Sequence, residues 1–173
     1  MRALTVIAII AAIAVGCTAT LYFYPSIING SGEQQQNLVV KGVTTSKNGY
    51  QQVNVKVNGI ELVADIAANN TQRTKGLAIK DHLNETESML FVFPSAAKQA
   101  FWMKDMKFPI DIIWMDANKT VVHIEHSLEP CPSIGYCQTY SPGADSLYVL
   151  ETVAGFADRH RVEEGTKIQF DLS

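Results

Sequence analysis

Strict alternation of apolar and polar positions marks the start of the folded part of the chain. In "QQVNVKVNGIELVADIA", residues 51–67, three valines alternate with polar residues before Asn58-Gly59, and the alternation resumes at Ile60. Asn-Gly favours a type I′ turn because both residues tolerate positive φ angles, and alternation on both sides of it is a strong hairpin signal. We therefore predict a β-hairpin here.

The later segments predict more strands and two short helices. "NNTQRTKGLAIKDHL" opens with residues that cap helices, and its Gly76 is placed to end a helix early. "SMLFVFP" and "IDIIWMD" are apolar on both faces, as in central strands, and "DANK" predicts a turn into the strand "TVVHIEH". "LYVL" and "TKIQFDL" predict two further strands around a short helix in "ETVAGFADRH". These elements predict an α+β fold with a mostly antiparallel sheet, which a chain of this size can curl into a small barrel.

An apolar run precedes this domain. No charge occurs between Arg2 and Glu33, and the run from Ala3 to Tyr24 is long enough to cross a bilayer as a helix. We interpret residues 1–24 as a transmembrane signal anchor with its amino end inside. A cleaved signal peptide is the alternative, as is a lipoprotein whose "AVGC" ends at Cys17, although an apolar segment follows where a lipoprotein has a polar tether.

Residues 25–50 are rich in Ser, Gly, Asn and Gln and predict a polar flexible tether, in which "NLVVKGV" has the option of adding an edge strand. Residues 51–173 then form a single globular domain. We predict a single-pass protein of the cell membrane with this domain on the extracytoplasmic side. Four Asn-x-Ser/Thr triplets would be glycosylation acceptors in a host that uses them, at Asn29, Asn69, Asn84 and Asn118.

Charge and motifs exclude several classes of function. With 14 basic and 17 acidic residues the net charge is -3, which offers no basic field for a nucleic acid. No serine lies in the strand-turn-helix setting of an activated nucleophile, and no glycine-rich phosphate loop is present in the sequence. We assign no catalytic residue, and whether the protein is an enzyme stays open.

Cys131 and Cys137 lie in the loop "EPCPSIGYCQTYSPG". In an exported domain two cysteines in such a loop are expected to form a disulfide. A metal site with His123 and His126 is the alternative, but residues three apart on a strand point to opposite faces. We therefore expect no metal and no cofactor.

The stretch "FWMKDMKFPIDIIWMD", residues 101–116, places charges among aromatic and aliphatic residues. On a strand, Asp111 shares a face with Ile113 and Met115, so its carboxylate needs a cation, hydrogen-bond donors or a raised pKa. A structural pair with Arg73 or Lys104 is one interpretation. The other is a ligand pocket with an apolar wall from Trp102 and directed polar contacts. The ligand-binding candidates are Arg73, Trp102, Lys104, Asp105 and Asp111.

Six blocks resemble a known family. "TQRTKGLA", "SMLFVF", "FWMKDM", "FPIDIIWMD", "PGADSLYVLE" and "GTKIQF" occur in order and closely resemble the family called domain of unknown function 192, small exported or membrane-tethered domains of bacteria and archaea. The resemblance covers residues 51–173 and implies a compact β-rich domain, a disulfide in the cysteine loop, and a site near the "FWM" and "PIDI" blocks. The family commonly has Lys-Asn-Thr where this chain has Lys104-Asp105-Met106, which changes the polarity there. Its biochemical role is unassigned.

Three functions remain open. We favour a non-enzymatic binding or accessory module that is tethered to the membrane and holds a small polar ligand, glycan or protein near Trp102 and Asp111. An envelope-acting enzyme would use Asp111 as acid or base, and this requires Asp111 to face a concave site. An exported metal-binding domain would use His123 and His126.

Overall fold

The computed structural model describes residues 44–172. The predicted anchor, residues 1–24 with Cys17, and residues 25–43 of the predicted tether, with its optional edge strand, lie outside the described residues. Within the described part, none of the helices has the length and hydropathy needed to span a bilayer.

The predicted hairpin is confirmed. Strand β1 (Gln52–Val57) pairs antiparallel with β2 (Ile60–Ala67), with Val57 opposite Ile60. Asn58 and Gly59 have φ angles of 47° and 88°, as both central residues of a type I′ turn require.

Residues 44–50, which the sequence places at the end of the tether, fold back on the hairpin. Thr45 forms a bridge with Gln51, the Ser46 carbonyl accepts a hydrogen bond from the Gly49 N–H, and the Tyr50 side chain is buried. Ordered structure therefore begins several residues before position 51.

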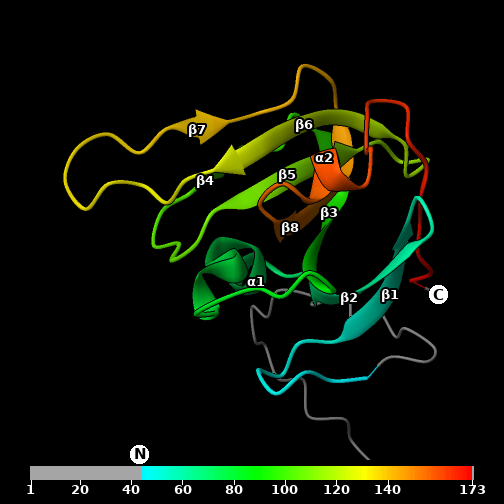
Figure 1. Cartoon of the computed structure of the whole chain (residues 1–173), viewed down its shortest axis with the longest axis horizontal. Coiled ribbons are helices and arrows are strands. Elements are labelled where there is room, and N and C mark those ends of the chain that lie inside the picture. Colours follow the sequence, from blue (N-terminus) through cyan, green and yellow to red (C-terminus); the bar gives the residue numbers. More distant parts are fainter. Residues whose placement is uncertain (1–43, 173) are drawn as a thin grey trace, which may run out of the picture. The chain divides into compact units, whose positions relative to one another are not determined.

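Seven strands form one curled sheet in the order β6-β5-β8-β3-β2-β1-β9 (Figure 1). The further strands are β3 (Glu87–Ala97), β5 (Ile110–Met115), β6 (Val121–Leu128), β8 (Ser146–Val153) and β9 (Ile168–Gln169). A second, two-stranded sheet pairs β4 (Phe101–Trp102) with β7 (Thr139–Tyr140). The main sheet forms a half-barrel, and a bridge from Thr120 to Lys167 joins the residues that precede its two edge strands.

The sheet is mixed rather than purely antiparallel, and most of its strand pairs are antiparallel as expected. β2 and β3 pair in parallel, while the other neighbours in the main sheet pair antiparallel. A parallel pair needs a crossover connection rather than a tight turn. Here the crossover contains α1 (Asn70–Lys75) and the short 3-10 helix η1 (Gly76–Ile79).

Both predicted helices are present, and α1 begins and ends as its sequence indicates. The Asn69 side chain accepts a hydrogen bond from the Gln72 N–H, and the Gln72 side-chain oxygen accepts one from the Asn69 N–H. This reciprocal capping box satisfies two N–H groups that the helix itself leaves free. Gly76 ends α1 with a φ of 49°, and helix α2 (Phe156–Arg159) follows β8.

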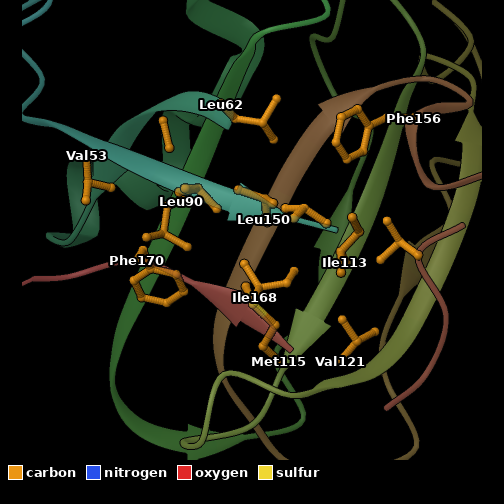
Figure 2. Close-up of a cluster of buried hydrophobic side chains, with 14 of the residues drawn as sticks. Val53, Leu62, Leu90, Ile113, Met115, Val121, Leu150, Phe156, Ile168 and Phe170 are labelled. Atoms are coloured by element: carbon orange, nitrogen blue, oxygen red, sulfur yellow. The ribbon is translucent and has the colours of Figure 1, made fainter. Parts of the chain in front are cut away.

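The sheet separates two hydrophobic clusters. The α2 cluster, drawn in Figure 2, contains Ile113 and Met115 from β5 together with Phe156. The Trp114 cluster, on the other face, contains Ile110, Ile112 and Trp114. The alternation predicted for β5 is therefore confirmed, and because both faces are covered all six residues of this strand are buried.

The predicted disulfide between Cys131 and Cys137 is present, with Cα atoms 5.3 Å apart. It closes the loop before β7, which extends away from the main sheet in Figure 1. The Cys131 N–H donates a hydrogen bond to the Met103 carbonyl at 3.0 Å, so the bridge connects this loop to the chain just after β4.

Replacing Cys131 and Cys137 together with serine should lower the free energy of unfolding by about 2 kcal/mol under oxidising conditions, because a short closed loop removes modest entropy from the unfolded chain. Urea unfolding of the full-length protein with and without reductant measures the change. The variant should be insensitive to reductant. Equal stability of the two proteins under oxidising conditions would show that the bridge does not stabilise the domain.

Candidate functional site

A pocket of about 320 Å³ lies where the end of α1, η1, β3 and β4 meet. This volume is at the small end of the range for ligand sites. We call it the α1–β4 pocket, and the lining residues used below are Arg73, Lys75, Gly76, Trp102, Lys104 and Glu151. Three of the five ligand-binding candidates from the sequence, Arg73, Trp102 and Lys104, therefore share one pocket.

The packing of Phe101 holds the aromatic wall of the pocket in place. The Phe101 ring makes edge-to-face contacts with Phe91 and Trp114, with ring centroids 4.9 and 5.8 Å apart. Because side chains alternate along β4, packing Phe101 inward turns Trp102 outward, where 54% of its surface is exposed. β4 also pairs with β7, which holds its backbone. Trp102 is thus an exposed indole on a strand whose backbone is held by pairing with β7 and by the packing of Phe101.

Arg73 is anchored by α1 and β3. Its guanidinium donates hydrogen bonds to the carbonyls of Ala68 and Val92 and lies 5.3 Å from the centre of the Phe93 ring. Partial burial lowers the pKa of Arg73, but arginine keeps its charge at any physiological pH. The charge is therefore held in a fixed position beside the pocket.

Two lysines add to this charge. Lys104 Nζ lies 6.0 Å from the centre of the Trp102 ring, within reach of a cation–π contact, and Lys75 ends α1. Among residues 44–172, no ion pair joins Arg73, Lys75 or Lys104 to a carboxylate. The three cations of the pocket are consequently not neutralised by the described protein.

Glu151 is a buried carboxyl group in the lining. On β8 it lies opposite Met89 of β3 and Ile112 of β5, and only 4% of its surface is exposed. Its Oε2 atom has no hydrogen-bond partner among the described residues. Burial raises the pKa of Glu151 to about 8, while hydrogen bonding from the Leu77 backbone acts in the opposite direction. The group is mainly neutral at pH 7.

The sequence interpretation missed Glu151. The available signal was its position on the strand: it shares a face with Val149 and Val153, and that face is otherwise apolar. An acidic residue in such a position must be paired, hydrogen-bonded or neutral. What this position could not show was that a pocket opens beside it.

Gly76 brings the backbone close to Glu151. A Cβ atom at this position would lie 3.4 Å from Phe91 Cζ and 3.9 Å from Glu151 Oε2, and the φ of 49° disfavours any side chain. A side chain at position 76 would therefore contact the carboxyl group, and glycine adds no such contact.

Asp111 does not line this pocket. Its carboxylate is fully buried on the opposite face of β5 and accepts three backbone hydrogen bonds, from Ser127 (2.7 Å), Gly155 (2.9 Å) and Ala157 (2.8 Å). The expected pairing with Arg73 or Lys104 was wrong, because backbone N–H groups at the start of α2 and in β6 fill that role. Its observed contacts are structural.

Asp105 also lies outside the lining. It is exposed in a turn with a φ of 62°, a backbone conformation that Asp and Asn tolerate better than most residues. Of the two polarity differences expected from the resemblance, the one at Asp105 therefore lies in a turn, whereas Met106 lines the pocket.

The histidines considered for a metal site have other partners. His123 Nε2 lies 3.1 Å from Glu125 Oε1, and His126 Nδ1 lies 3.1 Å from Asp158 Oδ1. Both loop cysteines are in the disulfide. Within residues 44–172, no group of three or more potential ligands is arranged to hold a metal ion.

Comparisons with known proteins agree with the fold. The family model DUF192, described as an uncharacterized ACR, matches residues 53–170. No curated protein matches the chain. A crystal structure from Sinorhizobium meliloti 1021, of a protein described as a candidate transcription regulator, is similar with a TM-score of 0.64 at 23% identity, over 70% of this chain and 95% of that one. A protein of unknown function from Novosphingobium aromaticivorans DSM 12444 gives a TM-score of 0.66 at 24% identity, over 80% and 99% of the two chains.

Proposed function

The chain belongs to the uncharacterized family DUF192, and we propose that its folded domain is a non-enzymatic binding module that holds a small ligand in the α1–β4 pocket. The observation that carries this proposal is that Arg73, Trp102 and Lys104 line one pocket together with Glu151, whose Oε2 atom has no hydrogen-bond partner among the described residues. Ligand sites commonly combine apolar walls with a few directed polar groups.

We place this module outside the cell membrane, tethered through residues 1–24. The uncharged apolar run from Ala3 to Tyr24 supports a membrane anchor. The disulfide supports an oxidising location, because such bridges persist mainly outside the cytoplasm. The membrane is then its partner through the anchor.

An enzyme remains a second candidate, with a different acid or base from the one proposed on sequence. The enzymatic interpretation required Asp111 to face a concave site, and its carboxylate is instead occupied by three backbone donors. Glu151 meets the requirement better, since a buried carboxyl group with a pKa of about 8 beside a pocket is suited to proton transfer. No activated serine or cysteine lines the pocket to act with it.

The proposal can be tested through Trp102, because the chain has two tryptophans and the other, Trp114, is fully buried. A library of small fragments of every charge type should contain members that change the Trp102 fluorescence of the full-length protein in a saturable way. Trp102→Ala should weaken their binding at least tenfold, measured by saturation-transfer NMR, and change the stability by less than about 0.5 kcal/mol.

Tyr136→Ala is the matched control, because this aromatic residue is 81% exposed in the disulfide loop and does not line the pocket. It should leave fragment binding unchanged. If no fragment produces a saturable response, or if Trp102→Ala binds the fragments as well as the natural protein does, the binding function in this pocket is wrong.

A further inference from the structure

The α1–β4 pocket is positively charged in a chain whose net charge is -3. Arg73, Lys75 and Lys104 contribute three positive charges to its lining, and no ion pair within residues 44–172 offsets them. Such a concentration of one sign in a concave surface attracts ligands of the opposite sign. A cationic ligand would be repelled, and an uncharged one would leave the three cations without a partner.

The carboxyl group in the pocket does not cancel this charge near neutral pH. Glu151 is surrounded by the apolar side chains of the Trp114 cluster, including Met89, Ile112 and Phe91, which favour its neutral form. Two other carboxyl groups lie on the same face of neighbouring strands, Asp65 and Glu87. Both are ion-paired with the same Lys80, at 3.1 and 3.8 Å, so this lysine offsets one of their two negative charges.

A neutral carboxyl group can donate a hydrogen bond. Glu151 is a lining residue of the pocket, its buried Oε2 has no partner among the described residues, and Gly76 beside it adds no side chain that would contact this atom. A neutral carboxylic acid in an apolar site is an effective donor to an anionic oxygen. The exposed indole of Trp102 supplies a flat apolar surface at the rim.

We infer that the α1–β4 pocket selects a small organic anion, a carboxylate or phosphate ester attached to a flat apolar group, and that Glu151 donates a hydrogen bond to its oxygen. This inference rests on the proposed function and specifies the ligand class. Arg73, Lys75 and Lys104 provide the charge, and Trp102 contacts the apolar group. Glu151 determines the pH range, because its ionised form lacks the proton and repels the anion.

The probes are benzoate and phenyl phosphate, each compared with an uncharged counterpart, benzamide or benzyl alcohol. Titrations of the full-length protein, followed by Trp102 fluorescence, should show at about pH 7 that each anion binds at least tenfold more tightly than its counterpart. At about pH 9.5, above the pKa of Glu151, benzoate should bind at least tenfold more weakly than at pH 7.

Two variants separate the roles of the side chains. Glu151→Gln keeps an N–H donor but cannot ionise, so it should bind benzoate at both pH values with less than a threefold difference, which also controls for titration of the lysines. Lys104→Gln should weaken benzoate at least threefold, whereas Lys98→Gln, an exposed lysine outside the lining, should not.

Each contrary result has a specific meaning. Benzamide that binds as tightly as benzoate would overturn the anionic class while leaving a binding function in place. A loss of affinity at high pH in Glu151→Gln as large as in the natural protein would overturn the role of Glu151. If neither anion gives a saturable response, the inference is wrong, and the proposed function fails as well only if the fragments of every charge type are also silent.

Discussion

Replacing Asp111 with alanine should lower the free energy of unfolding by about 3–5 kcal/mol, the largest loss we expect from one side chain. Its two carboxylate oxygens accept hydrogen bonds from the backbone N–H groups of Ser127, Gly155 and Ala157. Alanine would leave these three donors without a partner in the interior. Urea unfolding of the full-length protein at pH 7 measures the loss, provided that the m value is unchanged.

Asparagine at position 111 provides a graded test of the same contacts. Its single oxygen can replace Oδ1, which accepts from Ser127 and Gly155, but its NH₂ group would face the N–H of Ala157. Asp111→Asn should therefore cost about 1–3 kcal/mol, less than alanine. Asp105→Asn, exposed in a turn that asparagine tolerates, is the control and should stay within about 0.5 kcal/mol of the natural protein. An alanine variant as stable as this control would show that the contacts of Asp111 contribute nothing net to stability.

The free energy of unfolding should decrease as the pH rises from about 5 to about 8, because Glu151 loses its proton more readily in the unfolded chain than in the folded one. The pKa of Glu151 is raised from 4.5 to about 8 in the folded protein. Below pH 4.5 both the folded and the unfolded chain hold this proton, so the stability is fully present there. Above it the unfolded chain releases the proton while the folded chain retains it, which favours unfolding. By pH 8 the loss amounts to about 3–5 kcal/mol, since each pKa unit corresponds to about 1.4 kcal/mol.

Glu151→Gln isolates this contribution because glutamine has a similar shape and does not titrate. The difference in unfolding free energy between variant and natural protein should be small at pH 4.5 and increase steadily in favour of the variant up to pH 8. Glu61→Gln, an exposed change on β2, should leave the pH dependence as it is. Parallel stability curves for the natural protein and Glu151→Gln would contradict the burial of this carboxyl group in its neutral form.

Local patterns in the sequence predicted the local structure well. The turn at Asn58-Gly59, the end of α1 at Gly76 and the two faces of β5 each depend on φ preference or side-chain period, which neighbouring residues determine. The parallel pairing of β2 with β3 was not predictable in this way. It depends on where the crossover returns to the sheet, which is decided by the packing of distant segments.

Only part of the candidate site was predicted, because some of its residues are close in the sequence and others are brought together by long-range packing. Trp102 and Lys104 belong to one unusual stretch of sequence, and Arg73 was recognised as a cation able to reach it. Asp111 was misplaced because its partners are backbone N–H groups 16 to 46 residues away, which no side-chain pattern records. Glu151 was overlooked because the alternation along a strand shows which face a residue lies on, but it does not show whether a pocket lies beside that face.

The position of β8 in the sheet determines the order in which the fold can be completed. β8 lies between β3 and β5, although it follows β6 and β7 in the chain. While a ribosome is still synthesising the chain before residue 146, the β1–β2–β3 group and the β5–β6 hairpin have no strand to join them. Such long-range pairing forms late, after most of the chain has emerged. In a chain delivered across a membrane in extended form, the topology itself would postpone closure of the sheet until β8 arrives.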